Sequence, residues 1–123
     1  MSKHVLIADD EPNIVISLEF LMKREGHAVS VARDGPAALE AIRAGKPDLV
    51  LLDVMMPGLS GFEVCQAVRG DEALAGVKIL MLSAKGRDTD IAKGQALGAD
   101  AYMTKPFSTK ELAEKVRELL GAA

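Results

Sequence analysis

The feature of the sequence that most limits its fold is the aliphatic run Leu-Val-Leu-Leu at 49–52, which ends in Asp53. A strand needs apolar side chains on both sides of the pleat only when both of its faces are covered, as in a parallel sheet between helices. Pro57 and Gly58 follow Asp53 closely, so the chain leaves the strand there and enters a loop. An unpaired carboxylate is costly to bury, so an acid at this point is either solvent-exposed or functional.

Stretches typical of strands alternate with stretches typical of helices along the whole chain. We expect strands at 4–8, 28–32, 49–52, 77–82 and 101–103. We expect helices that begin near Pro12, Asp34, Ser60, Asp88 and Ser108. Proline suits the first turn of a helix, and serine followed three residues later by glutamate, at 60–63 and 108–111, is the pattern of a capping box.

This alternation predicts an α/β fold, with a five-stranded parallel sheet covered by five helices on both faces. The runs at 4–8, 49–52 and 77–82 are continuously apolar and suit central positions in the sheet. The runs at 28–32 and 101–103 are weaker and can tolerate an edge. The expected strand order is therefore 2-1-3-4-5, the doubly wound flavodoxin-like arrangement.

Composition fits one small domain and argues against several kinds of partner. With 123 residues the chain can form a single core, so residues 1–123 are expected to be one domain. A net charge of -3 gives no general attraction to nucleic acid or to an anionic membrane. Cys65 is the only cysteine, which suits a reducing cytoplasm, and no apolar run is long enough to span a bilayer. We therefore expect a cytoplasmic module.

Five polar residues follow strand ends that should meet at one edge of the sheet. In the expected order, the connections reverse direction between the first and third strands, and ligands bind beyond the carboxyl ends of the strands at that point. Asp9, Asp10 and Asp53 fall there. Ser83 and Lys105 follow the fourth and fifth strands and face the same crevice.

Such a cluster favours phosphoryl chemistry with a magnesium ion. Three neighbouring carboxylates repel one another, so at least one would have its pKa raised unless a cation intervened. An all-oxygen site suits Mg²⁺ better than Zn²⁺. Lys105 and Ser83 could bind two oxygens of a tetrahedral anion, and a carboxylate such as Asp53 can act as a nucleophile that forms an aspartyl phosphate.

Taken together, these residues resemble the response-regulator receiver domains of two-component phosphorelay systems. The matching residues are Asp9-Asp10, Asp53, Met56-Pro57, Gly61, Ser83 and Lys105-Pro106. Each match is weak alone, but the complete set, in this order on five strand–helix units, is highly specific. The similarity covers essentially the whole chain.

The resemblance implies a role for each of these residues. Asp53 would accept a phosphoryl group from a histidine kinase or a phosphotransfer protein, and Lys105 would pair with that group. The Lys105-Pro106 peptide bond is expected to be cis. The implied magnesium ligands are Asp10, Asp53, the backbone carbonyl of Met55 and, in an assisting role, Asp9. The chain would then be a phosphoacceptor that assists its own phosphorylation, and not an enzyme.

The resemblance also implies a switch. The phosphoryl group adds about -1.5 to -2 charges, Ser83 moves toward it, and Tyr102 swings into the space that Ser83 leaves. These movements would change the surface of the fourth helix, fifth strand and fifth helix, through which the domain could regulate a target protein or a fused output domain, or form a dimer. Direct binding to nucleic acid or to a membrane is not expected. The end at 120–123 fits either a stand-alone receiver or the front of a longer regulator.

Two positions bear on the lifetime of the phosphoryl group. In this family, the residues two past Asp53 and two past Ser83 flank the path of a hydrolytic water, and here they are Met55 and Lys85. An apolar side chain at Met55 cannot orient that water. We therefore predict slow self-dephosphorylation.

Three alternative functions fit parts of the pattern. A phosphohydrolase of the haloacid-dehalogenase type would need an acid two residues after the nucleophile, where this chain has Met55. A flavodoxin-like cofactor binder would need a phosphate-binding loop after the first strand, where this chain has the acids 9–11. A module that is never phosphorylated would not need the complete acidic set.

Overall fold

The computed structural model describes residues 3–84 and 88–121, and within them the strands and helices alternate as expected. The strands are β1 His4–Ala8, β2 Ala28–Ala32, β3 Leu49–Asp53, β4 Lys78–Ser83 and β5 Ala101–Thr104. The helices are α1 Pro12–Arg24, α2 Gly35–Gly45, α3 Gly61–Arg69, α4 Asp88–Ala96 and α5 Thr109–Leu119, with a short 3₁₀ helix η1 at Glu72–Leu74. Within these ranges, every helix is too short or too polar to cross a membrane.

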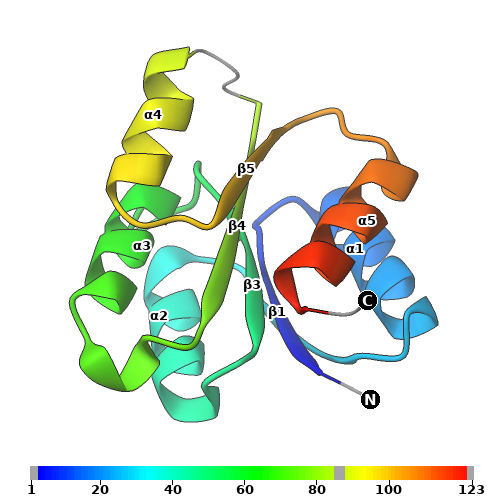
Figure 1. The fold of residues 1–123 in the computed structure, drawn as a ribbon, viewed down its shortest axis with the longest axis horizontal. Coiled ribbons are helices and arrows are strands. Elements are labelled where there is room, and N and C mark those ends of the chain that lie inside the picture. Colours follow the sequence, from blue (N-terminus) through cyan, green and yellow to red (C-terminus); the bar gives the residue numbers. More distant parts are fainter. Residues whose placement is uncertain (1–2, 85–87, 122–123) are drawn as a thin grey trace.

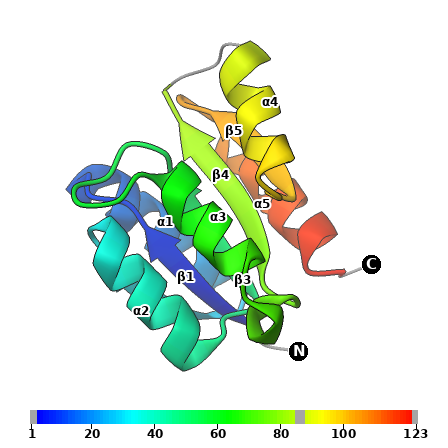
Figure 2. The same ribbon diagram turned by 90° about the vertical axis from the view of Figure 1, so that its left-hand side faces the viewer.

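The strands form one parallel sheet in the order β2-β1-β3-β4-β5, which confirms the predicted order. Helices α1 and α5 cover one face of the sheet, and α2, α3 and α4 cover the other (Figures 1 and 2). The structure therefore has three layers, and β1 and β3 lie side by side near the middle of the sheet.

The core consists of two apolar clusters, one on each face of the sheet. Along β3, Leu49 and Leu51 point into the cluster under α1 and α5, while Val50 and Leu52 point into the cluster under α2 and α3. All four side chains are fully buried. This explains why the run at 49–52 carries no polar residue, since both faces of its pleat are covered by helices.

The helices begin where capping side chains can satisfy the first free backbone N–H groups. Asp34 accepts a hydrogen bond from the backbone N–H of Ala37 at 2.7 Å at the start of α2. At α3, Ser60 and Glu63 form both bonds of the predicted capping box. At α5, Ser108 accepts from the backbone N–H of Glu111 at 3.0 Å, which is one half of the predicted pattern.

Small differences from the predicted boundaries lie at the ends of elements. Strand β5 continues to Thr104, one residue beyond the predicted end, because Thr104 pairs with Ser83 at the end of β4. The η1 turn was not predicted. Asp71 caps it by accepting from the backbone N–H of Ala73, and Leu74 anchors it in the core.

Candidate functional site

The carboxyl ends of β1, β3, β4 and β5 bring the predicted residues to one edge of the sheet. Asp9 directly follows β1, and its backbone N–H donates to the carbonyl of Ala32 at 3.1 Å. Asp53 is the last residue of β3. The backbone N–H of Lys105 donates to the carbonyl of Ser83 at 2.7 Å, so the ends of β4 and β5 are joined next to the site.

Three carboxylates form the centre of this edge. Asp9, Asp10 and Asp53 each offer an oxygen, and these oxygens lie within 4.8 Å of one another. Asp9 is 1% and Asp53 5% exposed, whereas Asp10 is exposed to solvent. Asp9 and Asp53 are thus almost completely buried, and they lie beside Asp10, which solvent can reach.

The ammonium of Lys105 lies between the two buried acids. Its Nζ donates a hydrogen bond to Oδ2 of Asp9 at 2.9 Å and lies 3.5 Å from Oδ1 of Asp53. Burial alone would lower the pKa of Lys105, but the hydrogen bond to Asp9 and the charge of Asp53 outweigh burial, so the pKa is raised. Lys105 therefore remains charged at neutral pH.

Asp53 is held in an environment that disfavours its charge. Burial is the main cause, and the neighbouring charge of Asp9 is the second; together they raise the pKa of Asp53 to about 6. Lys105 and the backbone N–H of Met55, 3.4 Å from Oδ1 of Asp53, oppose that rise. Crowding of the carboxylates was expected to raise the pKa of at least one of them, and here it adds to the larger effect of burial.

The donor set fits a hard divalent cation. The cluster offers carboxylate oxygens at close spacing, and its three acids exceed the single charge of Lys105, so it has negative charge left over. Mg²⁺ prefers such oxygen ligands and keeps several waters, which a partly open site can accommodate. An acidic cluster that could hold Mg²⁺ is therefore present.

A crevice gives access to this cluster from solvent. It has a volume of about 320 Å³ and is lined by Asp10, Glu11, Asp53, Met55, Ala84 and Lys105. A neighbouring hollow of about 520 Å³ shares Asp10 and Met55 and continues along the loop between β3 and α3. Met55 is 58% exposed, so an apolar group stands at the entrance to a crevice that is lined mostly by charged residues.

The remaining predicted residues lie on β4, on β5 and directly after β5. Ser83 is completely buried at the end of β4. Tyr102 is half-buried on β5, where it pairs with Met81 of β4. The Lys105-Pro106 peptide bond is cis. Lys85 lies outside the described residues.

One contributor was not assigned a role from the sequence. Glu11 lines the crevice, and its backbone N–H donates to Oδ1 of Asp9 at 2.9 Å. With Lys105 on Oδ2, both oxygens of Asp9 are thereby held in place. The only signal in the sequence was the position of Glu11 directly after the acidic pair.

Comparisons with known proteins agree with this geometry. Residues 5–117 match the family model described as the response regulator receiver domain. The chain is 45% identical over 120 residues to the alkaline phosphatase synthesis transcriptional regulatory protein PhoP of Bacillus subtilis, covering 98% of this chain and 49% of that protein. It is 43% identical over 120 residues to the DNA-binding response regulator MtrA of Mycolicibacterium smegmatis, covering 98% of this chain and 51% of that protein. The chain thus spans about half the length of these two relatives.

A solved structure is similar over its full length. The crystal structure of a response regulator from Chloroflexus aurantiacus superimposes with a TM-score of 0.93 at 33% sequence identity, covering 98% of this chain and 99% of that one.

Proposed function

This chain belongs to the family of response regulator receiver domains, and on that premise we propose that Asp53 is its phosphoacceptor. A carboxylate oxygen of Asp53 would attack the phosphorus of a phosphohistidine, so that a P–O bond forms as the P–N bond to the donor histidine breaks. The observation that carries this proposal is the position of Asp53 at the carboxyl end of β3. The Lys105 ammonium lies 3.5 Å from its Oδ1, and two further acids lie beside it.

We propose that Asp10 and Asp53 hold Mg²⁺ directly, with Asp9 assisting and the backbone carbonyl of Met55 as a further ligand. When bound, the ion would neutralise the crowded acids and the charge on the incoming phosphoryl oxygens. Asp9 is suited to the assisting role because its two oxygens are already occupied by the Glu11 N–H and by Lys105.

Lys105 and Ser83 would stabilise the phosphorylated state. Lys105 is shared between Asp9 and Asp53, so it can turn toward a phosphoryl group on Asp53 without leaving the crevice. The Ser83 hydroxyl would donate to another phosphoryl oxygen. We expect Tyr102 to move when Ser83 moves. The two residues lie on neighbouring strands, and the hydrogen bond from the backbone N–H of Lys105 to the carbonyl of Ser83 joins the ends of these strands.

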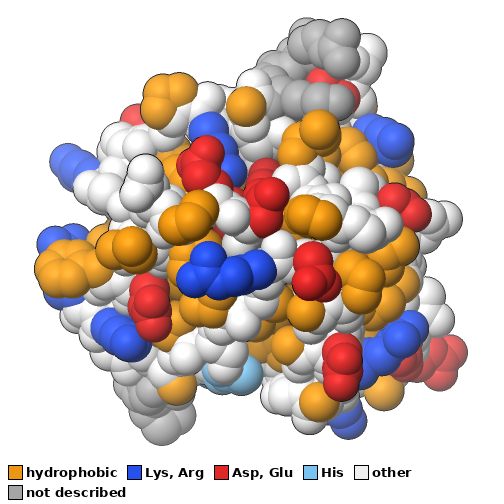
Figure 3. Space-filling model, turned by 180° about the vertical axis from the view of Figure 1, so that it is seen from behind, with side chains coloured by type: hydrophobic (Ala, Val, Ile, Leu, Met, Phe, Trp, Pro, Cys, Tyr) orange, Lys and Arg blue, Asp and Glu red, His pale blue; other side chains and the backbone are white. Residues whose placement is uncertain are grey.

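The partners of such a switch follow from the same proposal. A histidine kinase or phosphotransfer protein in the cytoplasm would supply the phosphoryl group, and the surface of α4, β5 and α5 would regulate a target protein or a fused output domain, or form a dimer. Direct contact with nucleic acid is not part of the proposal, since the net charge is -3 and the face in Figure 3 mixes acidic, basic and apolar side chains.

We also propose that residues 1–123 act as one phosphoacceptor domain and not as a phosphohydrolase. The thioether of Met55 cannot serve as the acid that hydrolysis of external phosphate esters requires at this place. Each molecule would keep its phosphoryl group for long enough to signal.

Phosphorylation by a small donor tests this function. Incubation with acetyl phosphate and Mg²⁺ should add one phosphoryl group to the wild type, detected by intact-protein mass spectrometry, and none to Asp53→Asn. Asp34→Asn is a matched control, because asparagine caps a helix as well as aspartate does and Asp34 lies outside the crevice. An unmodified wild type, or a phosphorylated Asp53→Asn protein, would overturn the proposal.

A further inference from the structure

Helix α4 meets the rest of the molecule in an unusual way. Among residues 89–96, the part of α4 whose burial the structure describes, the buried position is Gly94. By contrast, α3 buries Phe62, Val64, Cys65 and Val68. Among these residues, the position of α4 that is most withdrawn from solvent therefore carries no side chain.

The space that Gly94 leaves is filled by two neighbours. A Cβ atom at this position would lie 3.1 Å from Cδ2 of Tyr102, 3.2 Å from Sδ of Met81 and 3.5 Å from Cε2 of Tyr102. The first two distances are tighter than nine in ten contacts that a real Cβ makes, so the ring or the sulfur would have to move by a few tenths of an ångström. We call this space, bounded by Gly94, Met81 and the Tyr102 ring, the ring seat.

The three members of the ring seat differ in how easily they can move. Met81 is fully buried on β4, and side chains in a close-packed interior have little room to move. Tyr102 is half-buried at the edge of the same cluster, so part of the residue faces solvent. Glycine inside a helix also has a cost, since it forms helix less well than alanine. That cost is explained if the absent side chain makes room for the ring.

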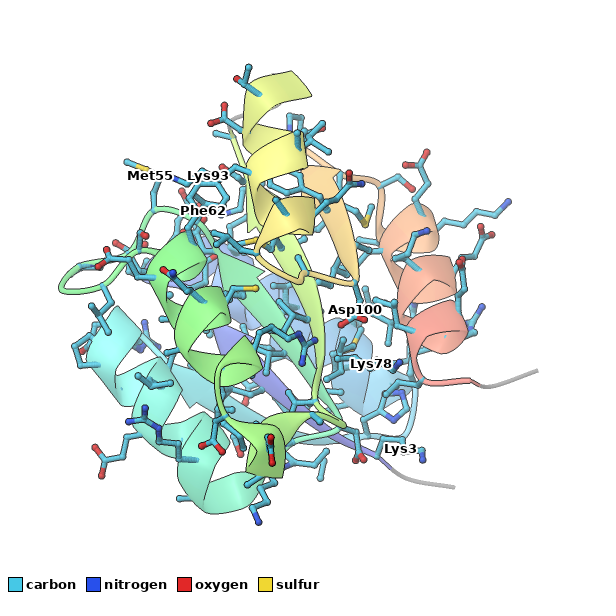
Figure 4. The ribbon with its side chains drawn as sticks, turned by 60° about the vertical axis from the view of Figure 1, so that its left-hand side comes forward. Lys3, Met55, Phe62, Lys78, Lys93 and Asp100 are labelled. Carbon is cyan, nitrogen blue, oxygen red and sulfur yellow. The ribbon has the colours of Figure 1, made fainter. Side chains whose placement is uncertain are left out.

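A second contact holds α4 beside the seat. Nζ of Lys93 lies over the ring of Phe62, 4.6 Å from the centroid, and links α4 to α3 next to the loop that carries Met55 (Figure 4). Phe62 is buried but Lys93 is exposed, and a cation–π contact made by an exposed lysine is weak. Packing in the ring seat is a second place where α4 lies directly against a side chain, that of Tyr102 on β5.

We propose that Gly94 is a positioning residue for Tyr102: it forms the seat that holds the ring against α4, and filling the seat moves the ring outward. Because Tyr102 belongs to the proposed phosphoryl switch, the size of the residue at 94 would also set how far the ring responds to phosphorylation. This second statement rests on the proposed function, whereas the first does not.

The chain contains its own probe for this test. Tyr102 is the single tyrosine and there is no tryptophan, so intrinsic fluorescence reports this ring alone. Without ligand, Gly94→Ala should raise the acrylamide quenching constant of the tyrosine by about twofold, since overpacking displaces the ring toward solvent. Gly76→Ala is the matched control, because a Cβ at Gly76 meets nothing within 4 Å, and it should leave the quenching constant unchanged.

Thermal unfolding separates a positional effect from a general loss of stability. In a Tyr102→Ala background the ring is gone, so the gain in helix formation from Gly94→Ala is opposed only by the contact with Sδ of Met81. The change in Tm caused by Gly94→Ala should therefore be more favourable in that background than in the wild type, by about 4 °C. Equal changes in the two backgrounds, or unchanged quenching in Gly94→Ala, would overturn the positioning role.

The link to signalling is tested with beryllofluoride, a non-covalent phosphoryl analogue, in the presence of Mg²⁺. It should change tyrosine quenching in the wild type and in Gly76→Ala. The change should be less than about half as large in Gly94→Ala, because a ring displaced toward solvent is no longer placed to follow Ser83. A full response in Gly94→Ala would overturn the regulatory statement. If beryllofluoride leaves tyrosine quenching in the wild type unchanged, the proposed function fails and the regulatory statement fails with it. The quenching and unfolding results obtained without ligand still decide the positioning role.

Discussion

Replacing Asp53 by asparagine should make the metal-free protein more stable. The structure buries the carboxylate of Asp53 beside Asp9, and these two influences raise its pKa from 3.8 to about 6 despite the nearby Lys105. The folded state therefore disfavours the charge that Asp53 carries at neutral pH. Asparagine keeps the shape of the side chain and can still accept from the backbone N–H of Met55, but it carries no charge.

The size of the effect follows from the shift in pKa. One pKa unit corresponds to about 1.4 kcal/mol, so the shift from 3.8 to about 6 sets an upper limit of about 3 kcal/mol on the stability gained by Asp53→Asn. A carboxyl group whose pKa is raised on folding is protonated in both states at a pH below its unfolded-state pKa, so there it does not lower stability. Above its folded-state pKa it is charged in both states and lowers stability by the full amount. The gain should thus be largest above pH 6, about half as large near pH 5, and absent below pH 3.8.

Urea unfolding with EDTA at pH 5.0 and 7.5 measures this gain. We expect Asp53→Asn to be more stable than the wild type by about 2 kcal/mol at pH 7.5, and Mg²⁺ to narrow the difference because it binds the wild-type cluster more tightly. Asp10→Asn removes one charge at an exposed position of the same cluster and should change stability by less than about 1 kcal/mol. A wild type as stable as Asp53→Asn at pH 7.5, or a difference that does not depend on pH, would refute the reasoning.

Four further predictions concern the site and the fold. Excess EDTA should abolish labelling by acetyl phosphate, and added Mg²⁺ should restore it; labelling that persists in EDTA would argue against the metal site. Met55→Asn should shorten the lifetime of the phosphorylated protein by roughly tenfold, since an amide can orient a water in the crevice that a thioether cannot; an unchanged rate of phosphate release would contradict this. Ser60→Ala should cost about 1 kcal/mol in urea unfolding by removing the cap of α3, whereas Ser60→Asp should retain most of the stability. Arg69→Ala should cost about 1–3 kcal/mol, because Arg69 donates to the carbonyl of Gly98 and to Asp100, both at 2.8 Å, and a cost near zero would show that water replaces these bonds.

The fold could be predicted because its main determinants are local. The run at 49–52 requires a strand covered on both faces, and the structure buries every residue of it. The strand order then followed from the polarity of the outer strands, and the meeting of Asp9, Asp53 and Lys105 followed from the strand order. These residues did not need to be close in sequence, since a parallel sheet collects its strand ends at one edge.

What could not be predicted depends on contacts between elements. The bond from Glu11 N–H to Asp9 requires the backbone conformation of the turn after β1, which the residue types do not specify. The role proposed for Gly94 depends on the position of the Tyr102 ring. From the sequence alone, a glycine in a helix indicates only a less stable helix. At 108–111 the sequence pattern was right, but one of the two capping bonds formed among the described residues.

The contact between Lys105 and Asp9 joins residues that are 96 positions apart. During synthesis, a chain that has not yet emerged beyond β5 contains the three acids of the cluster but lacks the Lys105 ammonium that pairs with two of them. On the function proposed for Asp53, we therefore expect the domain to accept a phosphoryl group only after its last strand has joined the sheet.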